Sequence, residues 1–198
     1  MSISLSAVLF AGGESRRMGT DKATLRFAGK PLWQHQLSLL RQLQLSEILV
    51  SARIDPVWRP NDVDLVLDAT ELHGPLSGLA AALARVRTSH LLALAIDMPF
   101  MTADYLRSLG EGIRANSGVV PMIADRAEPL AAIYPAKAIA QVFAGLRGPD
   151  FSLQNVVRQL LRDGELHAIP VGNAERRFFR NLNAPGDLAS TRDHAGHC

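Results

Sequence analysis

Residues 5–22 read LSAVLFAGGESRRMGTDK, an apolar run that passes directly into a loop rich in glycine and cations. The run at 5–10 is typical of a buried strand. Glycines in the loop let backbone N–H groups approach an anion closely, and Arg16, Arg17 and Lys22 add positive charge beside them. This combination favours a phosphate-binding loop over the alternative, a tight turn with solvated arginines.

The spacing of the glycines separates this loop from two common nucleotide-binding motifs. A P-loop requires lysine directly after its last glycine, but Gly19 is followed by Thr20. A dinucleotide-binding fingerprint requires G-x-G-x-x-G, which Gly12, Gly13 and Gly19 do not supply. The loop therefore predicts phosphate binding of another kind, at the end of the first strand.

Beyond this loop, short apolar runs alternate with longer segments of helical period. Strands are predicted at residues 47–52, 64–67, 91–96, 118–123, 130–134 and 166–171. Helices are predicted to begin at Pro31, near Ser77 and after Thr102, to cover 153–161, and to follow Asp187. Strands interleaved with helices indicate an α/β fold with a mostly parallel sheet, in which ligands bind at the carboxyl ends of the strands.

The length of 198 residues predicts one domain, or at most two small ones, and the composition, 47% hydrophobic and 20% charged, is that of a globular chain. The formal net charge is +2 with no basic block, so nucleic acid is not an expected partner. The longest apolar run, 91–96, is far shorter than the roughly 20 residues that cross a bilayer. The N-terminal residues lack the positive segment of a secretory signal. Cys198 is the single cysteine, so we expect no intrachain disulfide and a reduced, cytoplasmic setting.

The segment LFAGGESRRMGTDK at 9–22 resembles the signature of the molybdenum cofactor guanylyltransferases, a MobA-like family of nucleotidyltransferases whose pattern is close to L-A-G-G-x-x-x-R-M-G-x-D-K. Further matches follow in order along nearly the whole chain: GKPLWQH at 29–35, Asp68, GPLSG at 74–78, DMP at 97–99 and NLNAP at 181–185. The resemblance implies a three-layer α/β/α sandwich with a mostly parallel, Rossmann-like sheet of the nucleotide-diphospho-sugar transferase type. It further implies one domain over 1–192, with a nucleotide-binding first half and an acceptor-binding second half, followed by a flexible tail at 193–198.

The resemblance also implies an activity, the Mg²⁺-dependent transfer of GMP from GTP to the terminal phosphate of molybdopterin or molybdenum cofactor, with release of pyrophosphate. Molybdoenzymes or their chaperones are further partners that it implies. The attacking phosphate oxygen is already a nucleophile near neutral pH, so no general base is needed. Catalysis then depends on positioning and on stabilising charge at the phosphates.

Three residues are the candidates for this chemistry. Asp97 directly follows the apolar run 91–96 and is the predicted magnesium ligand, against the alternative of a turn or capping aspartate. Lys22 is predicted to contact the β- or γ-phosphate, against the alternative of a solvated lysine. Arg16 is preferred over Arg17 for the leaving pyrophosphate.

The resemblance assigns ten positions to nucleotide binding: Phe10, Ala11, Gly12, Gly13, Lys22, Arg53, Asp68, Gly74, Gly78 and Asp97. Asp68 belongs to the guanine side of that site, and Gly74 and Gly78 would let the backbone approach the base or ribose, unless they form only a turn before a helix. Arg53 departs from the pattern, since the family carries V-N-A-N where this chain has VSAR at 50–53. Its guanidinium would donate to the base or to a phosphate, or point away.

The acceptor side is predicted at Pro129 and Leu130, within a segment that reads Glu-Pro-Leu where many relatives have His-Pro-Thr. Asn181 and Asn183 alternate along an expected strand end and therefore share one face, which the resemblance places near the acceptor phosphate. The tail at 193–198 contains two histidines and a cysteine. We interpret it as a frayed terminus, because it lacks a fourth metal ligand.

Two other functions compete with guanylyl transfer. One is a CTP-dependent enzyme, or one acting on a sugar or alcohol phosphate. Such relatives more often read A-A-G where this chain has Ala11-Gly12-Gly13, which favours guanine. The other is a non-catalytic GTP-binding module that delivers a cofactor. Release of pyrophosphate, and the nucleotide that produces it, separates the three.

Overall fold

The computed structural model describes residues 3–12, 21–68 and 74–182. The glycine-rich loop at 13–20, the expected helix after Asp187 and the tail at 193–198 lie outside the described residues.

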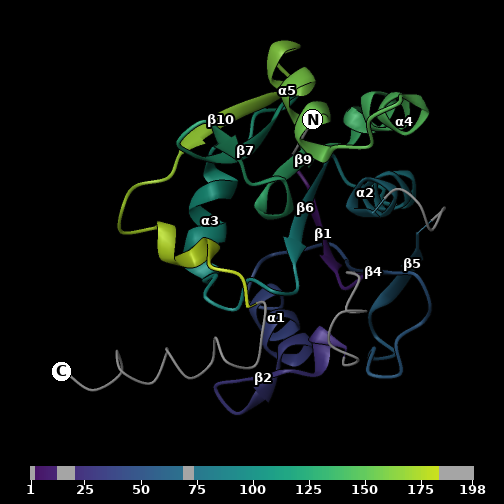
Figure 1. The fold of residues 1–198 in the computed structure, drawn as a ribbon, viewed down its shortest axis with the longest axis vertical. Coiled ribbons are helices and arrows are strands. Elements are labelled where there is room, and N and C mark those ends of the chain that lie inside the picture. The colour runs from purple at the N-terminus through teal and green to yellow at the C-terminus, as the bar shows by residue number, and fades with distance from the viewer. Residues whose placement is uncertain (1–2, 13–20, 69–73, 183–198) are drawn as a thin grey trace.

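Ten strands and five α-helices make up the described part of the chain (Figure 1). The strands are β1 Leu5–Phe10, β2 Arg26–Phe27, β3 Lys30–Pro31, β4 Ile48–Ala52, β5 Asp64–Leu67, β6 His90–Ala95, β7 Gly118–Ile123, β8 Arg126–Ala127, β9 Ile133–Pro135 and β10 Leu166–Pro170. The α-helices are α1 Leu32–Leu40, α2 Gly74–Arg85, α3 Ala103–Glu111, α4 Ile139–Arg147 and α5 Leu153–Arg162. Four short 3-10 segments join them: η2 Lys22–Thr24, η3 Pro129–Ala131, η4 Ala136–Ala138 and η5 Arg176–Phe179.

The central sheet has the strand order β10-β7-β9-β6-β1-β4-β5, with β8 paired to β7. Strand β1 pairs in parallel with β4 and β6, β4 pairs in parallel with β5, and β7 with β10. Only β9, among the strands on this path, runs antiparallel to its neighbours β6 and β7. The predicted mostly parallel sheet is confirmed.

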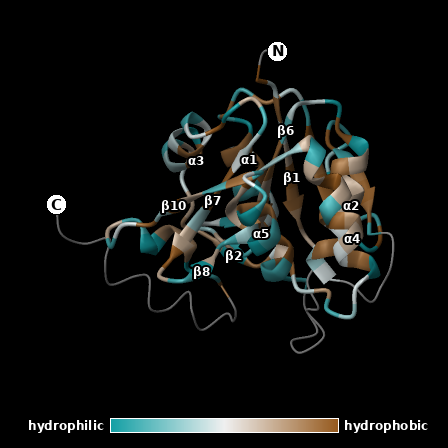
Figure 2. Cartoon of the chain, turned by 90° about the horizontal axis from the view of Figure 1, so that it is seen from above, coloured by the Kyte–Doolittle hydropathy of each residue, from teal (hydrophilic) through white to brown (hydrophobic). Residues whose placement is uncertain are grey.

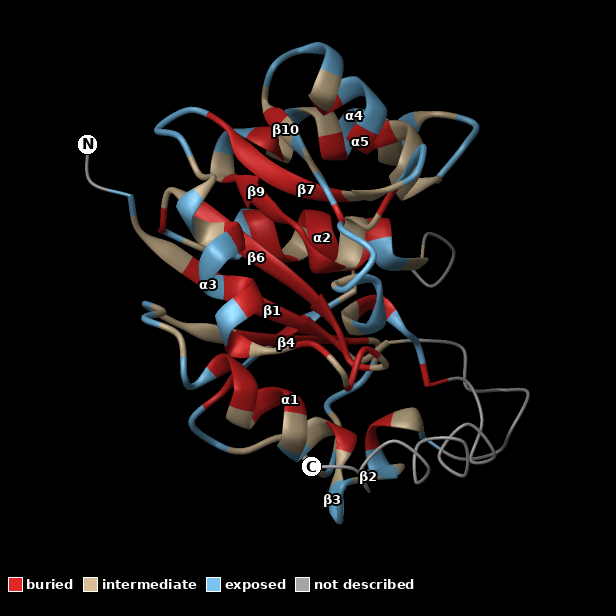
Figure 3. Ribbon diagram, turned by 90° about the vertical axis from the view of Figure 1, so that its left-hand side faces the viewer, coloured by how far each residue is buried: buried red, intermediate tan, exposed pale blue. Residues whose placement is uncertain are grey.

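Two apolar layers cover the two faces of the sheet, which explains why the strands read as continuous apolar runs. In β1, Ala7 and Leu9 pack into one core while Val8 and Phe10 pack into the other. Helices α1 and α3 supply the first core, and α2, α4 and α5 supply the second. Figure 3 shows the central strands buried, and Figure 2 shows hydrophobic residues concentrated along β1 and on α2. This is the predicted three-layer α/β/α arrangement.

Several element boundaries differ from the sequence expectation. Helix α2 begins at Gly74 and not near Ser77, because Gly74 adopts φ of +53° and Pro75 fits the first turn that follows. The strand expected at 130–134 is instead η3 followed by the short β9. Tyr134 donates a hydrogen bond of 2.8 Å to the Pro129 carbonyl oxygen, which closes that turn. Helix α4 was not predicted.

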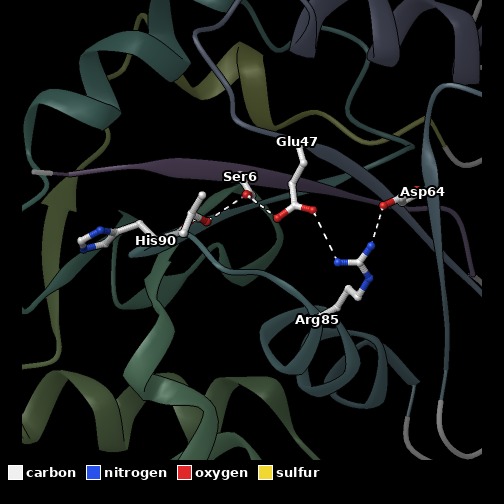
Figure 4. Close-up of polar contacts among 6 residues, drawn as sticks. Ser6, Glu47, Asp64, Arg85 and His90 are labelled. Atoms are coloured by element: carbon white, nitrogen blue, oxygen red, sulfur yellow. Dashed lines mark hydrogen bonds and ion pairs between the residues drawn. The ribbon is translucent and has the colours of Figure 1, made fainter.

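A polar network joins the elements at the amino ends of the parallel strands (Figure 4). The Ser6 hydroxyl of β1 donates to Glu47 at 3.1 Å, and the Thr88 hydroxyl lies 2.8 Å from that of Ser6. Arg85, the last residue of α2, pairs with Asp64 of β5 at 2.8 Å and with Glu47 at 3.9 Å. One guanidinium therefore binds two carboxylates at this end of the sheet.

The tightest backbone approach in the sheet gives a test of the fold. A Cβ at Gly118 would lie 1.9 Å from the Ile133 carbonyl oxygen, whereas a Cβ at Gly110 in α3 would meet nothing within 4 Å. We expect Gly118→Ala to lower the free energy of unfolding by about 1–3 kcal/mol or more, since β9 must move. We expect Gly110→Ala to raise it by up to about 1 kcal/mol. Urea denaturation measures both, and equal stabilities would contradict this packing.

Candidate functional site

A cavity of about 210 Å³ opens at the carboxyl ends of β1, β4, β5 and β6. Parallel strands bring these ends to one edge of the sheet, so residues from distant parts of the sequence meet there. The lining residues are Phe10, Ala11, Gly12, Lys22, Ser51, Asp68, Pro75, Ala95, Ile96, Asp97 and Leu130.

Helix α1 fixes the turn that carries Asp97. The buried Gln36 amide donates to the Met98 carbonyl oxygen at 2.8 Å and lies 3.4 Å from the carbonyl oxygens of Ala95 and Ile96. His35, one residue earlier, lies 2.9 Å through Nε2 from the carbonyl oxygen of Pro99. These bonds satisfy main-chain acceptors that a turn at the end of a buried strand would otherwise leave unpaired.

Lys22 reaches the cavity from η2, which Asp21 caps. One Asp21 carboxylate oxygen accepts from the Ala23 N–H at 2.9 Å and the other from the Trp58 indole at 2.9 Å. Trp58 in turn stacks on Trp33 of α1 at a ring distance of 5.6 Å. Asp21 therefore ties the segment that carries Lys22 to the loop after β4 and, through the two indoles, to α1.

Lys22 and Asp97, 75 residues apart in the chain, form an ion pair in the cavity. The Lys22 Nζ lies 3.1 Å from Asp97 Oδ2, and the two side chains are 25% and 22% exposed. The main chain of Asp97 also accepts a hydrogen bond of 2.8 Å from the Leu182 N–H. That bond brings Asn181, an exposed residue outside any strand, beside the same turn.

Asp68 follows β5 and continues its pairing, since its N–H donates to the Ala52 carbonyl oxygen at 3.1 Å. Its carboxylate Oδ1 accepts a hydrogen bond of 2.8 Å from the Ser51 hydroxyl. Burial raises the pKa of the Asp68 carboxyl, while the Ser51 hydrogen bond and the positive charge of Arg53 oppose that rise. The cavity therefore holds two carboxylates, one paired with an ammonium and one with a hydroxyl.

The cavity unites most of the residues that the sequence assigns to nucleotide binding. Seven predicted site residues line it: Phe10, Ala11, Gly12, Lys22, Asp68, Asp97 and Leu130. Gly13, Arg16 and Asn183 lie outside the described residues.

Five other predicted site residues lie off the lining of this cavity. Arg53 lines a neighbouring hollow of about 470 Å³, together with Trp58. Gly74 and Gly78 belong to α2, with Gly78 packed against Ser51 and Asp68. The carbonyl of Pro129 binds the Tyr134 hydroxyl, and Asn181 lies outside any strand, not at the strand end that we expected.

Ser51, Pro75, Ala95 and Ile96 line the cavity without having been predicted. Ser51 carried a signal, because it precedes Arg53 by two residues at the end of an expected strand and period-two alternation places both on one face. Strand β4 ends at Ala52, so the alternation stops there and only Ser51 faces this cavity.

The oxygen donors of the cavity determine what kind of cation it can hold. Within the described ranges, no group of three or more histidine, cysteine, aspartate or glutamate side chains is arranged to bind a metal. The Lys22 ammonium beside Asp97 shows that this carboxylate accepts a cation at close range. A hard cation sharing its ligands between Asp97 and the oxygens of a bound anion fits this donor set, whereas a complete protein cage does not.

The sequence is similar to those of known proteins. A family model described as "MobA-like NTP transferase domain" matches residues 7–166. A protein of Opitutus terrae named "Probable molybdenum cofactor guanylyltransferase" is 36% identical over 96% of each chain.

Two solved structures share the fold. The Archaeoglobus fulgidus "Molybdopterin-guanine dinucleotide biosynthesis protein A" is 24% identical with a TM-score of 0.70, covering 93% of this chain and 95% of its own. A 4-diphosphocytidyl-2C-methyl-D-erythritol synthase of Anaerococcus prevotii is 12% identical with a TM-score of 0.74, covering 98% of this chain and 97% of its own. In the part of the chain that the structure describes, no helix is long and apolar enough to cross a membrane.

The Gln36 amide gives a test of how the Asp97 turn is held. We expect Gln36→Leu to lower the free energy of unfolding by about 1–3 kcal/mol, because buried carbonyl oxygens lose their donor. Gln34→Leu, the same change at an exposed position of α1, is the matched control and should change stability by less than about 0.5 kcal/mol. Urea denaturation compares the two, and equal losses would remove Gln36 from this role.

Proposed function

Because the chain belongs to the MobA-like NTP transferase family, we propose that it transfers GMP from GTP to the terminal phosphate of molybdopterin or molybdenum cofactor and releases pyrophosphate. The name of the Opitutus terrae relative supports this substrate class. The observation that carries the proposal is the Lys22–Asp97 pair, held in a cavity at the carboxyl ends of parallel strands with Asp68 in the same lining.

The proposed reaction demands little proton transfer from the protein. An oxygen of the acceptor phosphate forms a bond to the α-phosphorus of GTP. The bond from that phosphorus to the bridging oxygen breaks, and pyrophosphate leaves with the electron pair. Since the nucleophile is already an anion, the task of the site is to align the groups and to neutralise charge on the leaving oxygens.

Lys22 is the described cation placed for that task. An ammonium is a compact point charge that binds phosphate oxygens without a fixed geometry. Its partner in the structure, Asp97, is a carboxylate, so a triphosphate entering the cavity competes for the same charge. We propose that Lys22 exchanges Asp97 for a β- or γ-phosphate oxygen when GTP binds, which releases the Asp97 carboxylate.

Asp97 is then the residue that we propose to hold Mg²⁺, together with phosphate oxygens of GTP. One carboxylate, with phosphates and waters completing the coordination, is a usual arrangement for this ion. When bound, Mg²⁺ would neutralise charge on the triphosphate. Gln36 and His35 keep the Asp97 turn in place through its carbonyl oxygens, so the carboxylate projects from a rigid support.

The acceptor is proposed to enter from the side of Leu130, the residue of the predicted acceptor segment that lines the cavity. Glu128, close to Leu130 in the chain, has a pKa that burial raises and the charge of Arg126 partly lowers. Asn181 directly precedes Leu182, whose N–H donates to the Asp97 carbonyl oxygen, and we keep it as a proposed contact of the acceptor.

The reaction itself is the first test of the proposal. Wild-type protein with GTP, Mg²⁺ and molybdopterin should release one pyrophosphate for each guanylyl group transferred. Asp97→Asn keeps the size of the side chain and removes its charge, so we expect turnover to fall by a factor of about 100 or more. The circular dichroism spectrum of Asp97→Asn should match that of the wild-type protein, which shows that the fold is unchanged. Turnover with CTP alone, or no pyrophosphate release with any nucleotide, would contradict guanylyl transfer.

Affinity for GTP tests the role of Lys22. Lys22→Ala should weaken GTP binding by about 1.5–3 kcal/mol, because a hydrogen bond to a charged group is lost. Lys137→Ala is the matched control, since Lys137 pairs with Glu165 at 3.6 Å and does not line the cavity. Titration calorimetry without acceptor measures both. Unchanged affinity in Lys22→Ala would exclude Lys22 from the phosphate site.

A further inference from the structure

Ser51 is a buried polar residue of the cavity to which the proposed reaction gives no role. Its side chain is 1% exposed, and it lies near the end of β4, paired with Phe10 of β1 on one side and Val66 of β5 on the other. A residue fixed by strands on both sides has little freedom to move. Its hydroxyl donates to Asp68 Oδ1 at 2.8 Å, and a carboxylate can only accept that bond.

Two glycines enclose the Ser51–Asp68 pair. A Cβ at Gly78 would lie 2.3 Å from the Ser51 Oγ and 2.9 Å from Asp68 Oδ1. A Cβ at Gly12 would lie 3.1 Å from Asp68 Oδ2. Backbone therefore packs closely against both oxygens of the carboxylate, and the open direction left to Asp68 is the cavity that it lines.

We infer that Ser51 is a positioning residue that orients the Asp68 carboxylate to accept two hydrogen bonds from the base of the nucleotide, and so selects guanine. The inference rests on the proposed function and deepens it. With Ser51 on one lone pair of Oδ1, the carboxylate keeps Oδ2 and a second lone pair of Oδ1 for the ligand.

The chemistry of the base edges explains the selection. Guanine presents two adjacent donors, N1–H and the exocyclic amine, which match the two acceptors of one carboxylate. Cytosine and adenine each present a donor beside a ring-nitrogen acceptor, whose lone pair would face a carboxylate oxygen. A site that hydrogen-bonds one ligand rejects analogues that leave its buried polar groups unpaired.

The charge state of Asp68 supports the same role. Burial raises the pKa of this carboxyl, and the Ser51 hydroxyl and the Arg53 charge oppose the rise. The charged side chains that line the same cavity are Lys22 and Asp97, which pair with each other. The ionised carboxylate can accept on both oxygens, whereas a protonated carboxyl carries a donor on one of them, so Ser51 both aims the group and favours its accepting form.

The test compares a matched pair of variants, Ser51→Thr and Ser51→Val, which have the same shape and differ only in the hydroxyl, with Ser51→Ala as a smaller third variant. Binding of GTP and of ITP, whose base lacks the exocyclic amine, is measured by calorimetry. Kinetics with molybdopterin give kcat and KM for each nucleotide. Thermal unfolding shows that each variant is folded at the assay temperature, and Ser51→Ala, which only removes an atom, serves where the larger side chains do not fit.

We expect Ser51→Val and Ser51→Ala to weaken GTP binding about tenfold, to bring the GTP and ITP affinities together, and to raise KM with little change in kcat. Ser51→Thr should retain the preference of the wild-type protein. As the solution is acidified, GTP affinity should begin to fall at a higher pH in Ser51→Ala than in the wild-type protein. The reason is that Asp68 loses a hydrogen bond that favours its ionised form, so its pKa rises.

The inference would be overturned if Ser51→Val and Ser51→Thr showed the same ratio of GTP to ITP affinity. A fall in kcat with no change in that ratio would overturn it as well. Failure of the proposed function gives a different result. In that case the wild-type protein releases no pyrophosphate, while the calorimetric preference for GTP and its loss in Ser51→Val still support the role of Ser51. Normal pyrophosphate release with an unaltered preference in Ser51→Val rejects the inference alone.

Discussion

Burial of β1 and β6 on both faces is the constraint on which the rest of the structure depends. The two strands pair in parallel along six residues, from Leu5 opposite His90 to Phe10 opposite Ala95. Their side chains alternate between two apolar cores, so neither strand can shift by one residue without exchanging the cores that its side chains fill. The fixed register brings the residues after both strands to the same edge, and it is there that Gly12 and Asp97 line one cavity.

The strands were the most predictable part of the fold, because a strand buried on both faces shows as an apolar run. The predicted bounds of β1, β5 and β7 are those of the structure, and the predicted family is confirmed by the match over 7–166. Helix α4 was missed, although α5 was not. The sequence of α4, IAQVFAGLR, does have apolar residues at helical spacing (Ile139, Val142, Phe143 and Leu146), but only Val142 is fully buried, and this pattern was not recognised, whereas that of α5 was.

The site was predictable where a motif carries it and unpredictable where only tertiary packing does. Lys22, Asp68 and Asp97 follow from the pattern of the chain and meet in one cavity. Gln36 bonds to carbonyl oxygens about sixty residues away, a contact that no local pattern in α1 announces. Arg53 was expected to contact the base or a phosphate, or to point away; β4 ends one residue earlier, at Ala52, and the arginine lines the neighbouring hollow. The Gln36 contact depends on where β6 ends, and the place of Arg53 depends on where β4 ends.

The two ends of the sheet use carboxylates in opposite ways. At the amino end, Glu47 and Asp64 bind the same guanidinium of Arg85, and Glu47 also accepts from Ser6 (Figure 4). These two carboxylates have partners within the fold, and neither lines the cavity. At the carboxyl end, Asp97 and Asp68 line an open cavity, one facing an ammonium on a flexible stem and the other a neutral hydroxyl. The Lys22 ammonium can exchange Asp97 for another anion, and the Ser51 hydroxyl does not neutralise Asp68. This end of the sheet therefore keeps charged groups with which a ligand can pair. The same sheet is thus stabilised at one end and prepared for binding at the other.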